Sequence, residues 1–377
     1  MKIVNVDVFT HWAAWCNWLF VRVSTDEGLA GWGEGSLHGA AGAVETAIHE
    51  LTPVLLGRDP AGVERHWHRV YHAWRWRGGP IQQTALAALD TALWDLEGKR
   101  LGVPVYRLLG GPIATRFRSY ASHWMEDATT PEQAHDAAQE AVRRGFSGFK
   151  WSPFPVAWWR DGEARGIRRA TKLMEAARSG AGPDVDIFVE CGERLSPRTL
   201  PLVAAAFEPY RPSWFEEPIP FENAKAMAQV QHQLTVPIAT GERLLSRWDF
   251  REVLEEGACR IVQPDVMHAG GITEVRKIAA MADTYYVSVA PHNPGGPISM
   301  LAAMHLMASI PNAYVLEQME GERELRDSIC THPIPYRDGC FELTERPGLG
   351  TDLDLEALAA RPHRAQPVRD GDGRIWH

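Results

Sequence analysis

The pattern of apolar and polar residues changes character after about residue 115. The first ten residues, MKIVNVDVFT, alternate apolar and polar positions as a half-buried β-strand does. The segment WLFVRVSTDEGLAGWGE holds two more strand-like runs around a turn signal at Asp26, Glu27 and Gly28. In IQQTALAALDTALWDLEGKRLG, leucines recur at helical spacing until Gly102 ends the pattern. Residues 1–115 are therefore predicted to form a small α+β domain.

From about Ser119 onward, short apolar runs alternate with helical patterns. Eight segments have the pattern of strands: RSYASHW, FSGFKWSP, VDIFVECG, PSWFEEP, VPIATGE, RIVQPDV, VSVAPHN and AYVLEQM. Between the first two, Thr130 and Gln133 form a capping-box pattern that predicts the start of a helix, and Gly145 suits its end. Eight strands with helices between them predict a parallel β/α barrel. We assign the barrel to residues 116–329 and expect the loop-rich residues 330–377 to pack back on the first domain.

Polar side chains follow the predicted barrel strands at their carboxyl ends, where the active site of such a barrel lies. Strands two to eight end near Lys150, Glu190, Glu216, Glu242, Asp265, His292 and Glu317. The equal spacing of the three glutamates from Glu190 to Glu242 is about one β/α unit, so they should lie at the same height on adjacent strands. Converging carboxylates suit Mg²⁺, which prefers oxygen ligands. A single carboxylate in such a place is commonly a helix cap or a surface charge, but this many together need a cation when buried.

Asp265 and His292 are predicted to lie on neighbouring strands. A carboxylate beside an imidazole fixes its tautomer and raises its basicity, which makes His292 a candidate general acid or base. A structural histidine bonded to an aspartate is the alternative for this pair taken alone. Cys191, next to Glu190, is disfavoured as a reactive thiol, because strand alternation turns it away from the side that Glu190 faces.

Composition and charge narrow the functional classes. The net charge of −9 argues against a nucleic-acid-binding protein, which would carry a basic patch. No apolar stretch approaches the roughly 18 residues of a membrane span, and the first residues lack the pattern of a signal peptide. The five cysteines are scattered and form no CxxC pair. We therefore expect a reduced, cytoplasmic protein without a disulfide framework or a zinc cluster.

Several segments taken together resemble the enolase superfamily, most of all the sugar-acid dehydratases of its mandelate racemase branch. They are GWGE, RGGPIQQTALAALDTALWDLEGK, FEEP, GERLLSR, QPDVMHAGGITE and APHNPGG, and the likeness covers nearly the whole chain. The stretch FKWSPFPVAWW is similar to gluconate- and galactonate-type dehydratases. The resemblance implies an α+β cap over a modified TIM barrel, a homo-oligomer and Mg²⁺ held by the three glutamates. It also implies Asp265 and His292 as the acid/base dyad, with Glu317 beside the substrate carboxylate.

The reaction that this resemblance implies removes the proton α to the carboxylate of an acid sugar, an aldonate or an aldarate. Its removal places a second negative charge on the carboxylate oxygens, and Mg²⁺ with Lys150 nearby would stabilise the resulting enediolate. Loss of the β-hydroxyl then gives a 2-keto-3-deoxy sugar acid. The alternatives are a cycloisomerase or epimerase of a sugar acid, and a non-catalytic protein that binds acid sugars.

Two positions depart from the family pattern. Racemases of this branch carry Lys-x-Lys on strand two, but here Ser152 stands at the second position, so two-base racemisation is not expected. Galactonate- and gluconate-type enzymes carry a histidine where this chain has Gly192. We therefore expect His292 to take the α-proton and return it to the departing hydroxyl on the same face, which favours a syn elimination. A separate acid, namely His123, a tyrosine or water, is the alternative.

Three further residues are candidates for binding the substrate. His123 stands at the end of strand one, and Arg243 directly follows Glu242. Trp15 lies in HWAAWCNW, between two amino-terminal strands, where this branch places a specificity loop. A structural role is the alternative for His123, a bond to a neighbouring carboxylate for Arg243, and packing for Trp15 and the tryptophans around it.

Overall fold

The amino-terminal residues form an antiparallel sheet that packs on a long helix. The computed structural model describes residues 1–155, 158–160 and 162–366. Strands β1 (Ile3–Trp12), β2 (Asn17–Thr25) and β3 (Ala30–Glu34) pair antiparallel in that order. The helices that complete this cap are α1 (Ala41–Leu51), the 3-10 turn η1 (Thr52–Val54), α2 (Val63–Tyr71), α3 (Pro80–Leu101) and α4 (Val105–Leu108).

Two glycines of β3 allow the sheet to touch α3 closely. A Cβ atom on Gly33 would come within 1.9 Å of the carbonyl oxygen of Ala88, and one on Gly31 within 2.1 Å of that of Ala92. Only glycine permits this approach of strand to helix. Contact with α3 therefore fixes the GWGE segment and places Glu34 at the edge of the cap that faces the barrel.

Eight parallel strands are found among the described residues, and they form the barrel. Strands β4 to β10 lie side by side in chain order, and β11 pairs with β4. The backbone of Val289 bonds to Asn312 and Tyr314, and these bonds link β10 to the segment that leads into β11. The predicted β/α barrel is thus confirmed. Its strands are β4 (Arg116–Ser122), β5 (Gly148–Trp151), β6 (Asp186–Glu190), β7 (Trp214–Glu216), β8 (Ile238–Thr240), β9 (Ile261–Val262), β10 (Ser288–Val289) and β11 (Leu316–Met319).

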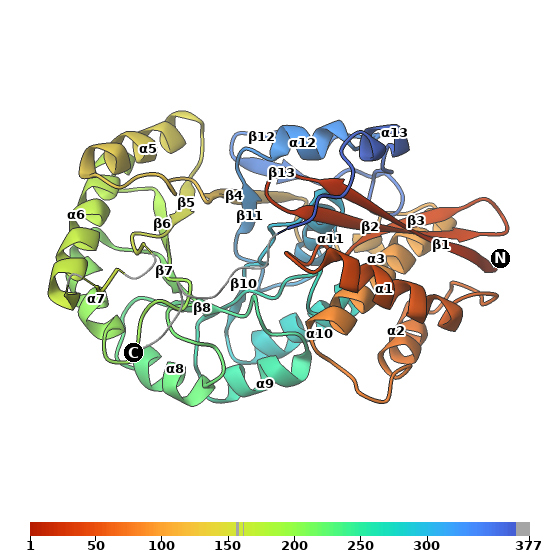
Figure 1. Cartoon of the computed structure of the whole chain (residues 1–377), viewed down its shortest axis with the longest axis horizontal. Helices are drawn as coiled ribbons and strands as arrows, with labels where there is room; N and C mark the ends of the chain where they lie inside the picture. Colours follow the sequence, from red (N-terminus) through yellow and green to blue (C-terminus); the bar gives the residue numbers. More distant parts are fainter. Residues whose placement is uncertain (156–157, 161, 367–377) are drawn as a thin grey trace.

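Helices surround the strands, and the cap lies beside one end of the assembly (Figure 1). The predicted capping box opens α5, because Thr130 accepts a bond from the backbone N–H of Gln133 and the Gln133 side chain bonds back to Thr130. The helices are α5 (Pro131–Arg143), α6 (Glu163–Ala181), α7 (Leu200–Phe207), the 3-10 turn η2 (Glu208–Tyr210), α8 (Ala224–Gln231), α9 (Arg247–Glu255), α10 (Gly271–Thr284) and α11 (Pro297–Met307).

A layer of large side chains fills the barrel interior below the strand ends. Phe188 of β6 and Trp214 of β7 stack with ring centroids 3.9 Å apart, and Tyr120 of β4 packs against both. Because side chains two residues apart on a strand face the same way, Glu190 and Glu216 also point inward, directly above this layer. The Trp214 indole N–H donates to Glu216 (3.0 Å), so the packed layer also orients a polar side chain.

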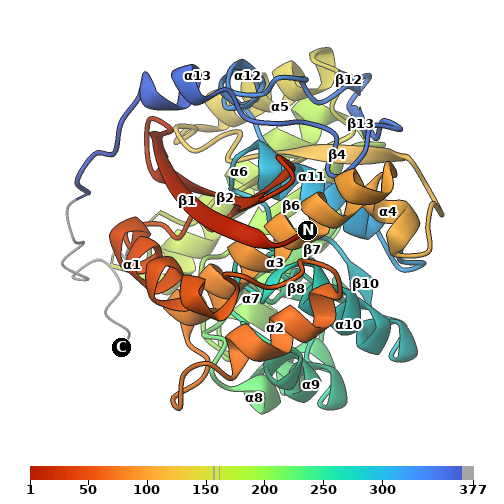
Figure 2. The same ribbon diagram turned by 90° about the vertical axis from the view of Figure 1, so that its right-hand side faces the viewer.

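The carboxyl-terminal segment touches both parts of the molecule. It contains α12 (Arg323–Ser328), β12 (Tyr336–Arg337), β13 (Cys340–Glu342) and α13 (Leu355–Ala359), and β13 pairs antiparallel with β4 of the barrel. Further along, the Leu349 N–H donates to Asp95 of α3, and the Trp12 N–H of β1 donates to the Arg361 carbonyl. Figure 2 shows the cap in front of the barrel with α13 beside β1. Residues 367–377 lie outside the described chain, and the boundaries after residues 115 and 329 stay predictions.

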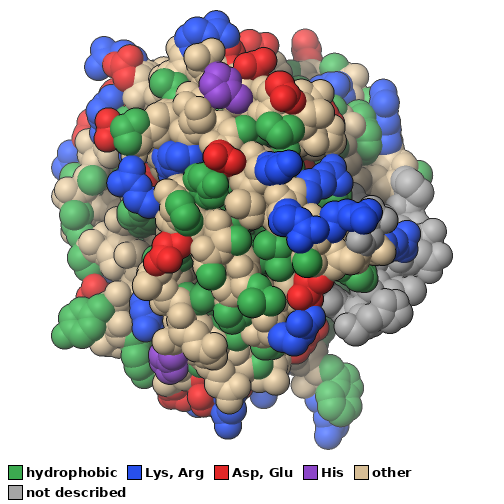
Figure 3. All heavy atoms as spheres, turned by 90° about the vertical axis from the view of Figure 1, so that its left-hand side faces the viewer, with side chains coloured by type: hydrophobic (Ala, Val, Ile, Leu, Met, Phe, Trp, Pro, Cys, Tyr) green, Lys and Arg blue, Asp and Glu red, His purple; other side chains and the backbone are tan. Residues whose placement is uncertain are grey.

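The surface charges, the helices and the cysteines can be compared with what the composition predicted. On the barrel face in Figure 3, acidic and basic side chains are interspersed. Within the described residues, no helix combines the length and apolar character that a membrane span requires. All five cysteines are free. Cys191 is buried, and burial with the charge of Glu190 raises its thiol pKa well above the ordinary value, so it is not an activated nucleophile.

Candidate active site

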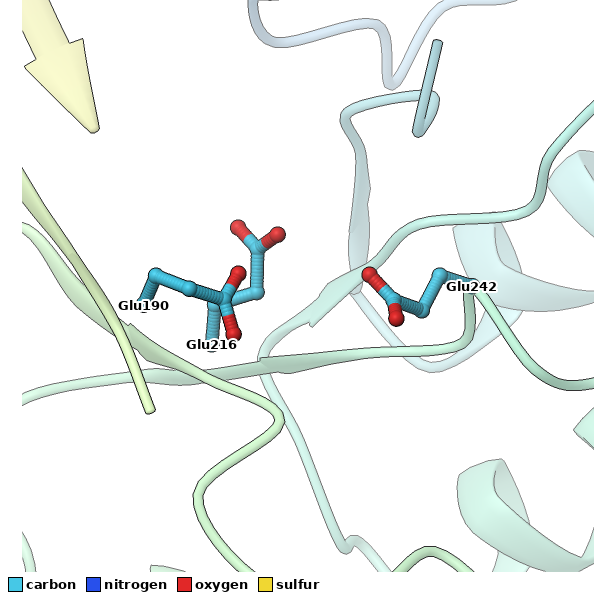
Figure 4. A group of neighbouring side chains, drawn as sticks. All are labelled: Glu190, Glu216 and Glu242. Atoms are coloured by element: carbon cyan, nitrogen blue, oxygen red, sulfur yellow. The ribbon is translucent and has the colours of Figure 1, made fainter. Parts of the chain in front are cut away.

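Three glutamates meet at the carboxyl ends of neighbouring strands. Glu190 and Glu216 are the last residues of β6 and β7 and are paired in register, while Glu242 lies two residues beyond β8. One carboxylate oxygen from each lies within 4.8 Å of the others. The three carboxyl groups point toward one another (Figure 4). These side chains could hold a metal ion, and an all-oxygen set of this kind is what Mg²⁺ prefers.

The electrostatics of the three glutamates also fit a bound cation. Burial, followed by the charge of Glu216, raises the pKa of Glu190 well above its ordinary value. For Glu242, burial acts in the same direction, but His292 and Arg243 hold its pKa below the ordinary value. Carboxylates this close together repel one another when ionised, and positive charge placed between them removes that repulsion.

Lys150 supplies one such positive charge. It lies on β5 with only 3% of its side chain exposed. Its Nζ bonds to Glu216 and lies 2.9 Å from Glu317 Oε1 and 3.7 Å from Glu190 Oε2. Burial lowers the pKa of Lys150, but the carboxylates of Glu216 and Glu317 outweigh it and raise the pKa well above the ordinary value. The ammonium group therefore stays charged inside the cluster.

Asp265 and His292 lie across the ring of strands from β5. His292 Nδ1 is 2.8 Å from Asp265 Oδ2, and the Met267 N–H holds the other aspartate oxygen at 2.7 Å. The second ring nitrogen, Nε2, lies 3.5 Å from Glu242 Oε2. Burial lowers the pKa of His292, whereas Glu242 and Asp265 raise it to a net value of about 10. The predicted pair is therefore in contact, with one imidazole nitrogen turned to the glutamates.

Glu317 of β11 contacts three different segments of this site. Its Oε1 accepts bonds from Ser122 of β4 (2.6 Å) and from Lys150, and its Oε2 accepts the Asn293 N–H (2.7 Å). Burial raises the pKa of Glu317, but Lys150 and His292 hold it well below the ordinary value. Glu317 is therefore an ionised anchor between Lys150 and the loop that carries His292. The strand pattern located Glu317 but gave no sign of Ser122 or Asn293.

Arg243 is engaged by protein carboxylates. Its Nη1 lies 2.9 Å from Glu242 Oε1 and 3.3 Å from Glu217 Oε2, and Nε is 3.7 Å from Glu193. Glu217 is fully buried and accepts bonds from Thr240 and Gly241, and burial with the charge of Glu242 raises its pKa to about 7. Sequence reasoning missed Glu217, although it follows Glu216 directly. A substrate-binding role for Arg243 stays a prediction.

His123 and Trp15 lie at the rim. His123 directly follows β4, with 53% of its side chain exposed and Nδ1 3.5 Å from Glu126. Trp15 lies in the turn between β1 and β2, where its indole N–H donates to Glu322 and its ring packs edge-on against His38. Trp18 instead lies on β2, fully buried, because its strand position faces the core. Trp15 is thus 38% exposed while Trp18 is buried, and a ligand contact for Trp15 or His123 stays a prediction.

Ser152 and Gly192, the two positions that differ from the family pattern, both lie next to Arg194. Arg194 Nη1 donates to Ser152 Oγ (2.8 Å) and to the Phe154 carbonyl (2.6 Å). A Cβ atom on Gly192, whose φ is +54°, would lie 3.5 Å from Arg194 Cζ and 3.5 Å from Glu190 Oε1. The guanidinium therefore lies over Gly192, beside the glutamates. Sequence reasoning did not single out Arg194, because its contact with Ser152 joins residues from two different strand ends.

A cavity of about 530 Å³ adjoins the site at Glu242, between the cap and the barrel. His268 forms part of its wall, with Nδ1 3.0 Å from Thr84 Oγ1 of α3 and Nε2 3.8 Å from Asp265 Oδ2. The cap contributes Leu37 and Pro80 to the same wall. The site thus opens toward the cap, which suits a ligand held between the two parts of the molecule.

An α+β cap lies beside a parallel β/α barrel, and ionisable residues converge at the carboxyl ends of the barrel strands. Together these features are typical of a barrel enzyme with its active site at that end. Residues 10–110 match the family described as mandelate racemase / muconate lactonizing enzyme, N-terminal domain, and residues 132–358 match the enolase C-terminal domain-like family. The chain belongs to the enolase superfamily, in its mandelate racemase and muconate lactonizing enzyme branch.

Individual relatives extend over nearly the whole chain. A D-galactonate dehydratase from Ralstonia nicotianae is 39% identical, covering 95% of this chain and 94% of its own length. One from Pectobacterium atrosepticum is 37% identical, covering 94% and 93%. Among solved structures, an enolase from Agrobacterium radiobacter with bound sodium and L-malate has a TM-score of 0.90 at 29% identity, covering 98% of this chain and 97% of its own. A member of the enolase superfamily from Salmonella Typhimurium has a TM-score of 0.89 at 33% identity, covering 96% and 98%.

Proposed function

We propose that this protein is a Mg²⁺-dependent hydro-lyase that converts an acid sugar, an aldonate or an aldarate, into a 2-keto-3-deoxy sugar acid. The observation that carries the proposal is the opposed arrangement at the barrel mouth. The His292–Asp265 pair faces Lys150 across three converging glutamates. Relatives named D-galactonate dehydratase, at 36–39% identity over most of the chain, support the same reaction class.

Glu190, Glu216 and Glu242 would hold the Mg²⁺ ion through their converging oxygens. The ion, when bound, stabilises negative charge that develops on the substrate carboxylate. Glu242, with its charge shared by a bound cation, would raise the pKa of His292 less, and this would favour the neutral imidazole that can accept a proton.

His292 takes the α-proton through Nε2, because Nδ1 is held by Asp265. Asp265 keeps the ring oriented and stabilises the imidazolium that forms. Lys150, fixed against Glu216 and Glu317, offers its remaining N–H to the substrate carboxylate as the enediolate develops. Glu317 holds Lys150 and the loop of His292 in register.

The same histidine completes the elimination. The proton on Nε2 passes to the departing β-hydroxyl, water leaves, and the resulting enol becomes the keto acid. Both transfers occur on one face of the substrate, so the elimination is syn. At the ends of β5 and β6, Ser152 and Gly192 lie beside Arg194, whose guanidinium has only hydrogen-bond donors and no atom that accepts a proton. That feature favours one-base elimination over racemisation.

The experiment is a screen of aldonates and aldarates with purified protein and Mg²⁺, in which semicarbazide detects the keto acid. We expect one or a few sugar acids to react and the His292→Asn variant to be inactive on them. Proton NMR in deuterium oxide separates the competing reactions, because an epimerase would exchange the α-proton without loss of water. Exchange alone, or binding without any reaction, would contradict the proposed dehydration.

A further inference from the structure

Glu34 of the cap reaches into the barrel and binds the start of α11. Its side chain is buried at the end of β3. Oε1 accepts the Gly296 N–H (2.5 Å), Oε2 accepts the Ser299 N–H (2.9 Å), and Ser36 Oγ donates to Oε1 (2.6 Å). The residue before α11, Gly296, has no side chain to cap the helix. Glu34 therefore satisfies amide groups that a local N-cap residue would otherwise bind.

The segment that Glu34 binds is continuous with the loop of His292. Only three residues separate His292 from Gly296, and Asn293 in between accepts a bond from Ser299 Oγ (2.8 Å) while its N–H donates to Glu317. The other end of this loop leaves β10, which is fixed in the sheet. Glu34 thus holds the second end of the loop that sets the position of the imidazole.

Asp90 of α3 binds the start of α10, the helix that follows the loop of Asp265. Its Oδ2 accepts the Thr273 N–H (2.9 Å) and its Oδ1 accepts Thr273 Oγ (2.6 Å), in the first turn of α10. The loop before α10 carries Asp265. A Cβ on Gly271 would come within 2.5 Å of Asp90 Oδ2, so the helix start has no room for a side chain where the carboxylate sits.

We propose that Glu34 and Asp90 are positioning residues that set the Asp265–His292 pair from the cap. Each carboxylate binds the first turn of the helix that follows one member of the pair. The amino-terminal cap therefore holds both loops at the distance that the 2.8 Å bond between Asp265 and His292 requires. Neither residue touches the glutamates or the reacting atoms. The effect on catalysis rests on the proposed role of His292, and a displacement of about 1 Å in such a group can lower the rate by about 10²-fold.

The chemistry of the contacts dictates the substitutions. In Glu34→Gln, one carboxamide oxygen can still accept an N–H, but the NH₂ group then faces the other N–H, and that amide loses its acceptor. Glu34→Asp keeps the carboxyl group but shortens the side chain by one methylene, so it cannot reach both amides. Asp90→Asn likewise replaces one accepting oxygen with a donor that points at Thr273.

Asp95 offers a matched control in the same cap. It is a fully buried carboxylate on α3, and its two oxygens also accept backbone N–H groups, from Trp32 (2.8 Å) and Leu349 (2.7 Å), while Lys99 of the same helix pairs with Oδ2 (2.7 Å). Neither partner lies in a loop that carries Asp265 or His292. Asp95→Asn should therefore loosen the cap without moving the dyad, which separates positioning from general stability.

The test compares wild type with Glu34→Gln, Glu34→Asp, Asp90→Asn and Asp95→Asn. Hydrogen exchange should rise at residues 290–299 in the Glu34 variants and at 263–275 in Asp90→Asn, and in neither segment for Asp95→Asn. With the best sugar acid, the Glu34 variants and Asp90→Asn should lose at least tenfold in kcat with KM within twofold, and Asp95→Asn less than threefold. Unchanged exchange in these segments, or an equal kcat loss in Asp95→Asn, would overturn the inference. A wild-type enzyme without turnover would overturn the proposed function instead, and the exchange data would still decide whether Glu34 and Asp90 anchor the loops.

Discussion

Replacing Lys150 with methionine should destabilise the protein strongly, and Mg²⁺ should restore much of the loss. The ammonium group is buried among Glu190, Glu216 and Glu317. Methionine fills a similar volume but leaves the three carboxylates without their internal positive charge. Removing one partner of a buried ion pair costs about 3–5 kcal/mol.

The size of the protein converts this free energy into a temperature shift. An unfolding entropy of about 2.1 cal/mol/K per residue, applied to 377 residues, makes each kcal/mol worth a little over 1 °C. Lys150→Met should therefore lower Tm by about 4–6 °C in EDTA. Since a cation among the glutamates replaces part of the lost charge, Mg²⁺ should raise Tm more in the variant than in the wild type.

Differential scanning calorimetry with EDTA or Mg²⁺ measures both effects. Lys277→Met is the control, because Lys277 pairs with Glu64 at the surface and is 29% exposed. Exposed pairs contribute about 0–1 kcal/mol, so its Tm should fall by no more than about 1 °C. If Lys150→Met melted within a degree of the wild type in EDTA, Lys150 would not be the counter-charge that the glutamates require.

Four further outcomes follow from the site and its surroundings. His292→Asn should lower kcat by about 10²–10⁴-fold in the keto-acid assay with an unchanged circular dichroism spectrum; a loss below tenfold would exclude it as the proton carrier. Glu242→Gln should weaken Mg²⁺ binding at least about tenfold in titration calorimetry, and an unchanged Kd would remove it from the metal site. Burial raises the pKa of Asp90 from 3.8 to about 7, so the folded state binds an extra proton between these values and stability falls as pH rises through that window. The Tm of wild type relative to Asp90→Asn should accordingly drop from pH 5 to pH 8, and a constant difference would contradict the burial effect. Arg194→Met should raise KM with the sugar acid more than Arg198→Met does, since Arg198 is exposed and paired with Glu163; equal KM values would show that Arg194 lies outside the substrate space.

The alternation of strand residues was sufficient to place part of the site. Glu190 and Glu216 end their strands as predicted, and the packed layer of Phe188 and Trp214 explains why they face inward. Strands β8, β9 and β10 are only two or three residues long. Glu242, Asp265 and His292 consequently lie two or three residues beyond the strand ends, where loop geometry replaces the period of a strand.

The contacts of Glu34 and Glu217 could not be predicted from the sequence, because their partners come from other segments of the chain. Glu34 stands in a segment that resembles the family, yet its bond to Ser299 joins residues 265 positions apart. The sequence alone does not distinguish Glu217 from a surface glutamate. Only in the fold do Thr240, Gly241 and Arg243 surround it. Local pattern gives the face of a strand or helix, whereas the contact of Glu34 depends on how the cap docks on the barrel, and those of Glu217 depend on how neighbouring strand ends meet.

The most direct test of the account is the fate of the α-hydrogen and the β-hydroxyl of one sugar acid in the same reaction. Proton NMR in deuterium oxide, with wild type and His292→Asn and with Mg²⁺ present, records both. The account predicts loss of one water per α-proton removed, a 2-keto-3-deoxy product, and neither event in His292→Asn. Exchange of the α-proton with the β-hydroxyl retained, or the same product from His292→Asn, would contradict it.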